Sequence, residues 1–366
     1  MKNKYITYLL VIFFQLTLPL NLYAHGEIPI EPQAVDINSF PPIEQDIQAL
    51  SNYGMAAQQA GERLVKRGSS ALYDLHHALT NPVSYQQQLQ VMTVLGQIGD
   101  ISSAELMIEA AEQSSNRYLS QNTLLALSNL EQSEDITEFV DRQLENKNTD
   151  PLITRSALAY YTKQPQPNAF HWVNEYNQAN TNADVRYAAL YLGGVLGVKS
   201  VKSDIISMLS SPQNSTREYY LLLGLAEITE LDEFNQLLEK LNINKYNVNR
   251  VRKYAEFRHS STADQARLAE QLINENDKSL KDAALNYLIK TKNADVLDAY
   301  WKRSDNYVTP AIKRAGFEIV KTEQGVKFKE HQEETSINIG VPFILISMLL
   351  TIVYVYITVY KARLNK

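Results

Sequence analysis

One apolar pattern returns along this chain of 366 residues at a nearly constant interval. The segments that begin at Val94, Tyr191 and Leu222 fall into one register. The third column of that register holds, in chain order, Gly96, Ser128, Tyr161, Gly193, Gly224, Phe257, Ile289 and Ile319, at intervals of 30 to 33 residues. Such a period is typical of repeat architectures, in which each unit stacks only on its neighbours. This spacing constrains the fold more than any other feature of the sequence.

Residues 183–212 indicate what one unit folds into. Apolar residues recur on one helical face at Val185, Ala188, Ala189, Leu192, Val195 and Leu196. This is the i, i+3, i+4, i+7 spacing of a buried helix face. Gly197 follows where a C-terminal cap is expected, and Ser211-Pro212 ends a second helix. We therefore predict a helix, a tight turn and a second helix, a pair that needs neighbours to bury its apolar stripe.

Segments between the register helices supply the second helix of each pair. These partner segments are Ser103 to Gln113, Asp135 to Leu144, Phe170 to Gln178, Phe234 to Leu241, Asp264 to Ile273 and Ala294 to Trp301. Upstream, Glu44 to Arg67 is predicted to be helical and to end at Gly68. The predicted fold class is all-α, with an α-solenoid of about eight helical hairpins over residues 44–326 and one C-terminal transmembrane helix.

Two parts of the chain resemble a known family. They are the run Val185-Arg186-Tyr187-Ala188-Ala189-Leu190-Tyr191-Leu192-Gly193 and a related unit at residues 88–113. They resemble HEAT-like repeats of the short type called PBS-lyase HEAT-like. The resemblance covers roughly residues 69–324, although the units near Tyr161, Phe257 and Ile289 lack the glycine. The tetratricopeptide pattern fits less well, because its period of about 34 residues is longer. The resemblance implies a binding surface more often than a catalyst.

Residues 1–24 have the composition of a secretory signal peptide. Lys2 and Lys4 form a basic start, residues 8–20 are mostly apolar, and Ala24 offers a small residue at the cleavage edge. Gln15 and Pro19 argue against a membrane span, and an uncleaved anchor is the alternative. Residues 25–43 contain four prolines with little periodicity, which predicts an arm or linker.

Residues 340–360 form an uncharged, apolar run of 21 residues, about the length that crosses a bilayer. A basic tail follows at residues 361–366, and residues 327–339 are predicted to be a juxtamembrane linker. Because basic residues beside a span stay cytoplasmic, the bulk of the chain is expected outside. The chain has no cysteine, whereas a secreted eukaryotic domain of this size usually carries disulfides. We predict a single-pass protein of a bacterial inner (cytoplasmic) membrane, with its bulk in the periplasm and its C-terminus in the cytoplasm.

Charge argues against nucleic acid as a partner. The whole chain has a net charge of −6, and its two end segments are basic. The basic residues of those segments are Lys2, Lys4, Lys361, Arg363 and Lys366, and neither segment contains Asp or Glu. The part between them is therefore more acidic still and should repel phosphate backbones.

No catalytic motif is present. The sequence lacks a Gly-x-Ser-x-Gly run, a phosphate loop and a Rossmann fingerprint, and its six histidines include no His-Glu-x-x-His. Gly193-Gly194 is interpreted as helix packing, because no strand precedes it. We predict no catalytic residues, no cofactor and no metal, and so no enzyme.

Four arginines recur at matching positions. Arg186, Arg217 and Arg250 each stand seven residues before the register column, and Arg155 stands six residues before Tyr161. Stacked units would place them in a row. One interpretation is a ladder of ion pairs with acidic neighbours such as Asp184 and Glu218. The other is a basic stripe that grips an acidic partner.

Tyrosines gather on the register helices, at Tyr160, Tyr161, Tyr187, Tyr191, Tyr219, Tyr220, Tyr254 and Tyr287. One interpretation is an aromatic groove for a peptide or partner helix, since tyrosine gives contact area at low entropy cost. The other is that half of them fill the core. The candidates for groove residues are Tyr187, Tyr191, Tyr219 and Tyr220, with Arg186, Arg217 and Arg250 as their basic neighbours.

These features predict a membrane-tethered extracytoplasmic scaffold that binds a protein or peptide partner through a solenoid groove. Two alternatives stay open. One is a lyase-like or other enzymatic accessory protein, because some short HEAT-like proteins attach or remove cofactors. The other is an assembly factor that acts through the transmembrane helix.

Overall fold

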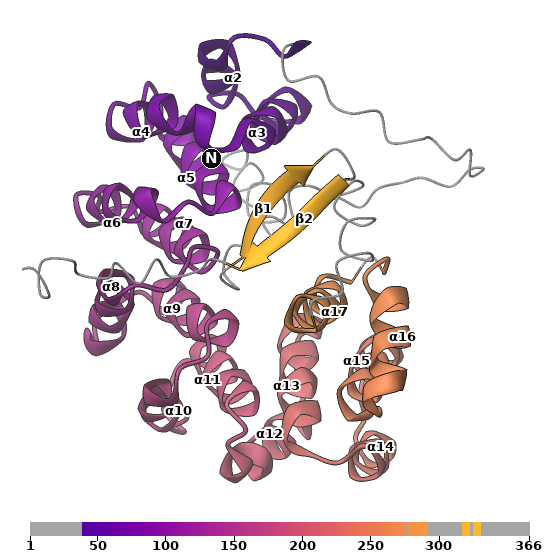
Figure 1. The fold of residues 1–366 in the computed structure, drawn as a ribbon. Coiled ribbons are helices and arrows are strands. Elements are labelled where there is room, and N and C mark those ends of the chain that lie inside the picture. Colours follow the sequence, from indigo (N-terminus) through magenta and orange to yellow (C-terminus); the bar gives the residue numbers. More distant parts are fainter. Residues whose placement is uncertain (1–38, 276, 292–316, 323–324, 331–366) are drawn as a thin grey trace, which may run out of the picture. The chain divides into compact units, whose positions relative to one another are not determined.

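The computed structural model describes residues 39–275, 277–291, 317–322 and 325–330 (Figure 1). From Ile43 to Lys290 the described residues form only helices and turns, so the all-α prediction is confirmed there. A buried apolar core runs from Ile47 to Ala255, and a second from Phe257 to Ile289. The residues predicted to form the signal peptide, the transmembrane helix and the basic tail lie outside the described residues, as do residues 294–301.

The helices alternate between two sets. The chain opens with α2 (Ile43–Ala49) and α3 (Met55–Arg67). The register segments form α5 (Tyr85–Ile98), α7 (Arg117–Leu127), α9 (Pro151–Lys163), α11 (Ala183–Val195), α13 (Ser215–Ile228), α15 (Lys245–His259) and α17 (Lys278–Lys290). The partner helices are α4 (Leu72–Thr80), α6 (Ala104–Glu112), α8 (Glu134–Glu145), α10 (Phe170–Tyr176), α12 (Lys202–Leu209), α14 (Leu231–Lys240) and α16 (Thr262–Leu272). Short 3-10 turns at 68–71, 101–103, 167–169 and 199–201 lead into α4, α6, α10 and α12.

Each register helix packs against the next one in the sequence. Contacts join α5 to α7, α7 to α9, α9 to α11, α11 to α13, α13 to α15, and α15 to α17. Each partner helix from α4 to α16 packs against the register helix that follows it. The recurring sequence register thus corresponds to a recurring set of helix contacts.

The start of every register helix is fixed by a side-chain cap. The capping residues are Ser84, Asn116, Asp150, Asn182, Asn214, Asn244 and Asp277, and in each the side-chain oxygen accepts a hydrogen bond from a backbone N–H of the first turn. These residue types satisfy donors that the helix itself leaves unpaired. The polar column therefore recurs with the same period as the apolar one and defines where each helix begins.

Glycines set how closely the register helices approach. A Cβ built on Gly194 would lie 2.5 Å from both Cα and the carbonyl oxygen of Gly224 in α13. A Cβ on Gly193 would lie 3.0 Å from Val173 and from Val201, on the partner side. The interpretation of Gly193-Gly194 as helix packing is confirmed.

The turn after α11 ends as predicted. Gly197 has φ +71°, and its N–H donates to the Gly194 carbonyl at 2.8 Å, while the Val198 N–H donates to the Gly193 carbonyl at 2.8 Å. This pair of bonds is a Schellman motif, in which a left-handed residue closes the helix. Glycine is favoured at this position because it adopts positive φ without a steric penalty.

Two local predictions were wrong. The predicted helix from Glu44 to Arg67 is interrupted between α2 and α3, where Gly54 has φ +85°. The last register segment is a strand: β1 (Phe317–Thr322) pairs antiparallel with β2 (Gly325–Glu330), and Ile319 lies opposite Phe328. The alternation of apolar and charged residues from Val326 to Lys329 is the period-two pattern of a strand, which competes with the helical one. The linker predicted for residues 327–339 accordingly begins inside β2.

Candidate partner-binding site

The structure brings the four candidate tyrosines together on α11 and α13. The ring centroids of Tyr187 and Tyr220 are 6.1 Å apart with nearly parallel planes, and Tyr191 lies 5.2 Å from Tyr220. The Tyr219 ring meets that of Tyr220 edge-on at 5.6 Å. We call these four residues the tyrosine cluster. Offset and edge-on contacts at such distances stabilise aromatic groups beyond the area that they bury.

Two residues of the tyrosine cluster are buried and two are half-buried. Tyr187 and Tyr219 are only 6% exposed, whereas Tyr191 and Tyr220 are partly accessible. Burial raises the pKa of all four hydroxyls, so each keeps its proton at neutral pH. Each hydroxyl can therefore donate a hydrogen bond. Tyr187 and Tyr219 pack in the core, and Tyr191 and Tyr220 offer the surface.

Each of the three candidate arginines has a carboxylate neighbour. Arg217 Nε lies 2.8 Å from Oδ1 of Asp184, one unit earlier in the chain, as the ladder interpretation predicts. Arg186 lies 3.7 Å from Asp204, and Arg250 forms an ion pair with Asp277. Pairs in partly exposed positions contribute little to stability, but they fix the neighbouring helices in register. The arginine row is therefore mostly neutralised within the array.

Glu218, the other acidic residue expected in the ladder, binds amides instead. Its carboxylate accepts a hydrogen bond from Nδ2 of Asn247 at 2.8 Å and from the backbone N–H of Asn244 at 3.1 Å. Asn247 is fully buried and also donates to the Ser215 carbonyl at 2.9 Å. This network ties the start of α13 to the start of α15.

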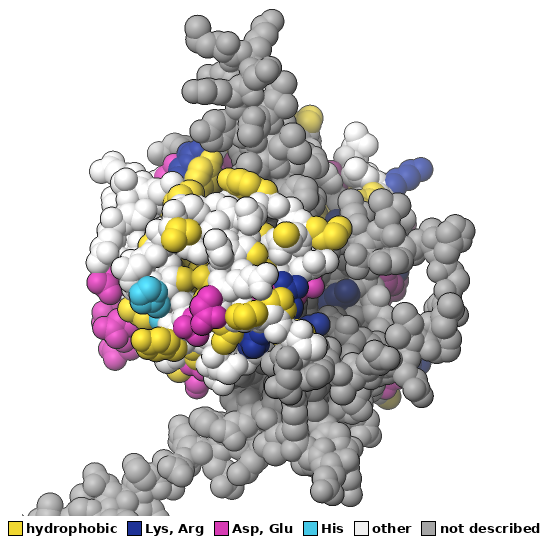
Figure 2. All heavy atoms as spheres, turned by 90° about the horizontal axis from the view of Figure 1, so that it is seen from above, with side chains coloured by type: hydrophobic (Ala, Val, Ile, Leu, Met, Phe, Trp, Pro, Cys, Tyr) yellow, Lys and Arg dark blue, Asp and Glu magenta, His cyan; other side chains and the backbone are white. Residues whose placement is uncertain are grey.

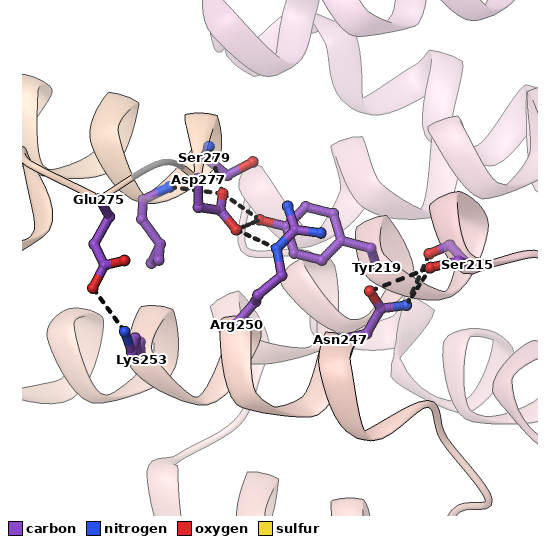
Figure 3. Close-up of polar contacts among 9 residues, drawn as sticks. Ser215, Tyr219, Asn247, Arg250, Lys253, Glu275, Asp277 and Ser279 are labelled. Carbon is purple, nitrogen blue, oxygen red and sulfur yellow. Dashed lines mark hydrogen bonds and ion pairs between the residues drawn. The ribbon is translucent and has the colours of Figure 1, made fainter. Parts of the chain in front are cut away.

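Asp277 is the polar centre of the site (Figure 3). Its carboxylate accepts hydrogen bonds from the Tyr219 hydroxyl at 2.9 Å and from the Ser279 N–H at 2.9 Å, and it pairs with Arg250. The Arg250 guanidinium in turn lies over the Tyr219 ring, 3.9 Å from its centroid. One carboxylate thus caps α17 and links it to α13 and α15.

Replacing Asp277 by alanine is expected to lower the free energy of unfolding by about 2 kcal/mol. The change removes a helix cap and leaves the buried Tyr219 hydroxyl without its acceptor. Chemical unfolding of the full chain followed by circular dichroism measures the loss. Tyr219→Phe, which removes the hydroxyl alone, should cost about 1 kcal/mol. Equal stability of Asp277→Ala and the unmodified chain would contradict this role.

A second carboxylate joins α13 to α15. Glu227 has a side chain only 8% exposed, and it accepts hydrogen bonds from the Tyr254 hydroxyl and from Arg258, whose Nη2 lies 2.6 Å away. Tyr254 is one of the tyrosines of the register helices, but nothing in the sequence marks Glu227, because a single glutamate on a helix carries no distinguishing pattern.

Large hydrophobic side chains are also exposed near the first helices. Tyr53 is 72%, Met55 74%, Tyr73 81% and Val83 77% exposed. Figure 2 shows hydrophobic side chains scattered over the face seen from above, with acidic groups along one edge. These exposed hydrophobic side chains were missed in the sequence because isolated apolar residues in loops and first turns follow no helical period.

The described residues contain neither a candidate metal site nor a helix able to cross a membrane. Within the described residues no group of three or more His, Cys, Asp or Glu side chains could hold a metal ion. No helix in the same part of the chain is long and apolar enough to span a membrane. No protein-family model and no curated protein matches this chain.

Proposed function

We propose that the chain is an extracytoplasmic adaptor, tethered to a bacterial inner membrane, that binds a protein or peptide partner through the tyrosine cluster. In this proposal the helices form an α-solenoid of short HEAT-like hairpins, and binding rather than catalysis is the function. The observation that carries it is the pairing of Tyr191 and Tyr220, two half-buried rings 5.2 Å apart on adjacent helices.

Rings held in this way favour binding. The Tyr220 ring is in contact with the rings of Tyr187, Tyr191 and Tyr219, and the ion pairs of Arg217 and Arg250 hold the neighbouring helices in register. Little conformational entropy is therefore lost when a partner covers the two half-buried rings. Tyrosine is enriched in the parts of interfaces that carry most of the binding energy. The uncharged run at residues 340–360 supports a membrane anchor in this chain. The acidic character of the chain supports a protein rather than a nucleic acid as its partner.

The test is capture of a partner by the full chain, solubilised from membranes in detergent. A partner bound through the tyrosine cluster should be retained by the unmodified chain and lost, about tenfold or more, from Tyr220→Ala, because a central aromatic contact contributes about 2 kcal/mol or more. Tyr73→Ala, which removes an exposed ring from α4, is the matched control and should retain the partner.

Thermal unfolding of both variants checks that the helices stay folded. A partner that binds Tyr220→Ala as well as the unmodified chain would overturn the proposed site. Loss of the partner from both Tyr220→Ala and Tyr73→Ala would place the contact elsewhere and would equally overturn the proposed site.

A further inference from the structure

Arg155 differs from the other three arginines of the row. Arg186, Arg217 and Arg250 each lie within 4 Å of a carboxylate oxygen. In the part of the chain that the structure describes, no carboxylate forms an ion pair with Arg155. Its side chain is half-buried on α9, one period before Tyr187. An incoming anion gains most binding energy at a partly buried guanidinium that has no counter-charge.

Arg155 lies beside the tyrosine cluster. Burial raises the pKa of Tyr187 and of Tyr220, and the positive charge of Arg155 opposes that shift in both. Arg155 and Tyr187 stand 32 residues apart, one repeat period, on two helices that pack against each other. Because α9 packs directly on α11, Arg155 stands at the α9 side of the cluster.

Asp282 has the opposite charge and stands 32 residues, one repeat period, after Arg250, on the helix that packs against α15. It lies in the second turn of α17, a helix held against α13 by the hydrogen bond from Tyr219 to Asp277. Its negative charge is among those that raise the pKa of Tyr191, although burial is the main cause. Asp282 is half-buried, and it forms no ion pair with any residue that the structure describes.

Arg155, Tyr191, Tyr220 and Asp282 lie on helices of one stack, α9, α11, α13, α15 and α17, and we call these four residues the strip. Arg155 comes from the first helix of that stack and Asp282 from the last, and Tyr191 and Tyr220 come from the helices between. We propose that the strip binds an extended segment of a protein partner that places an acidic side chain against Arg155 and a basic side chain against Asp282. Apolar or aromatic residues of the segment cover Tyr191 and Tyr220.

Charge complementarity carries this inference. Paired charges across an interface fix the direction in which a segment binds and exclude segments of the opposite polarity. Arg217 and Arg250 already have intramolecular partners, so they add little attraction for an anion. The inference rests on the proposed function and adds the chemistry and the direction of the partner.

A random dodecapeptide library displayed on phage, selected on the full chain in detergent micelles, tests the inference. We expect the enriched peptides to share an acidic and a basic position separated by apolar residues. Arg155→Glu should remove the preference for the acidic position, and Asp282→Lys the preference for the basic one. For one synthetic peptide from the selection, each reversal should weaken binding about tenfold or more.

Arg142→Glu is the matched control, because Arg142 is an exposed arginine of α8 that pairs with Glu112, away from the strip. It should leave the enriched peptides unchanged. If Arg155→Glu lowers the thermal stability of the chain, Arg155→Gln removes the charge and keeps the hydrogen-bonding capacity.

The outcomes separate this inference from the proposed function. Peptides that compete for the tyrosine cluster but show no charge preference, or a preference that Arg155→Glu does not change, would overturn the strip and leave the binding site standing. No enrichment on the unmodified chain would overturn peptide binding at the tyrosine cluster, and this inference with it.

Discussion

Replacing Gly194 by alanine is expected to lower the free energy of unfolding by about 3 kcal/mol. The added methyl group would lie 2.5 Å from Cα and the carbonyl oxygen of Gly224, which are backbone atoms of the adjacent helix α13. No side chain can rotate away to make room, so α11 and α13 must separate. Overpacking of this kind typically costs about 1 to 3 kcal/mol, and more where backbone is displaced. Thermal unfolding of the full chain, followed by circular dichroism, measures the effect.

Gly61→Ala is the matched control for this change. Gly61 is a buried glycine in the middle of α3, and its added Cβ would meet only side-chain atoms, of Val94 at 3.5 Å and Leu50 at 3.9 Å. Alanine forms helix better than glycine by about 1 kcal/mol, so Gly61→Ala should leave the chain as stable or slightly more stable. Equal stability of Gly194→Ala and the unmodified chain would show that α11 and α13 are not packed as described.

Replacing Arg63 by methionine is expected to cost about 4 kcal/mol, the largest effect of the substitutions considered. Arg63 contacts Asp46 through Nε, at 3.0 Å to Oδ1 and 3.2 Å to Oδ2, and through Nη2 at 2.5 Å. The Asp46 side chain is 1% exposed, whereas that of Arg63 is 26% exposed. Removing the arginine would leave a buried carboxylate without a counter-charge, which costs about 3 to 5 kcal/mol. The free energy of chemical unfolding measures the loss.

Asp46→Asn is the matched change on the other side of the pair, and it should cost less. Arg63 reaches solvent, so its charge can be hydrated when the carboxylate is gone, and the loss should be about 1 to 2 kcal/mol. A larger loss for Asp46→Asn than for Arg63→Met would contradict the burial of the two groups. Because the pair joins α2 to α3, both changes should act first on the N-terminal end of the array.

Much of the fold could be predicted because its period is carried by local signals. Of the register residues from Gly96 to Ile289, all lie in helices except Ser128, which directly follows the end of α7. Gly197 ends α11 with the positive φ expected of a cap. Apolar spacing, caps and glycines each act within one or two helical turns, so they are visible in the sequence. The strand at Phe317 was not predicted, because its apolar residues match both a helical and a strand pattern over a short run.

The site could be predicted only in part. Arg217 and Asp184 stand one period apart, so the stacking of units brings them together. Tyr219 and Asp277 are 58 residues apart, nearly two periods, and no nearest-neighbour argument pairs them. Tyr187 and Tyr191 are one turn apart in α11, yet one is buried and the other is half-buried. That difference depends on how far α11 is rotated against α13, which three-dimensional packing decides.

Photo-crosslinking in the producing cells tests the proposed binding site most directly. A photoreactive phenylalanine analogue placed at Tyr220, with the same analogue at Tyr73 as the control, reports which surface a partner touches. We expect a covalent adduct with one partner from position 220 and none from position 73. An adduct from position 73 alone, or the absence of one from position 220, would contradict binding at the tyrosine cluster.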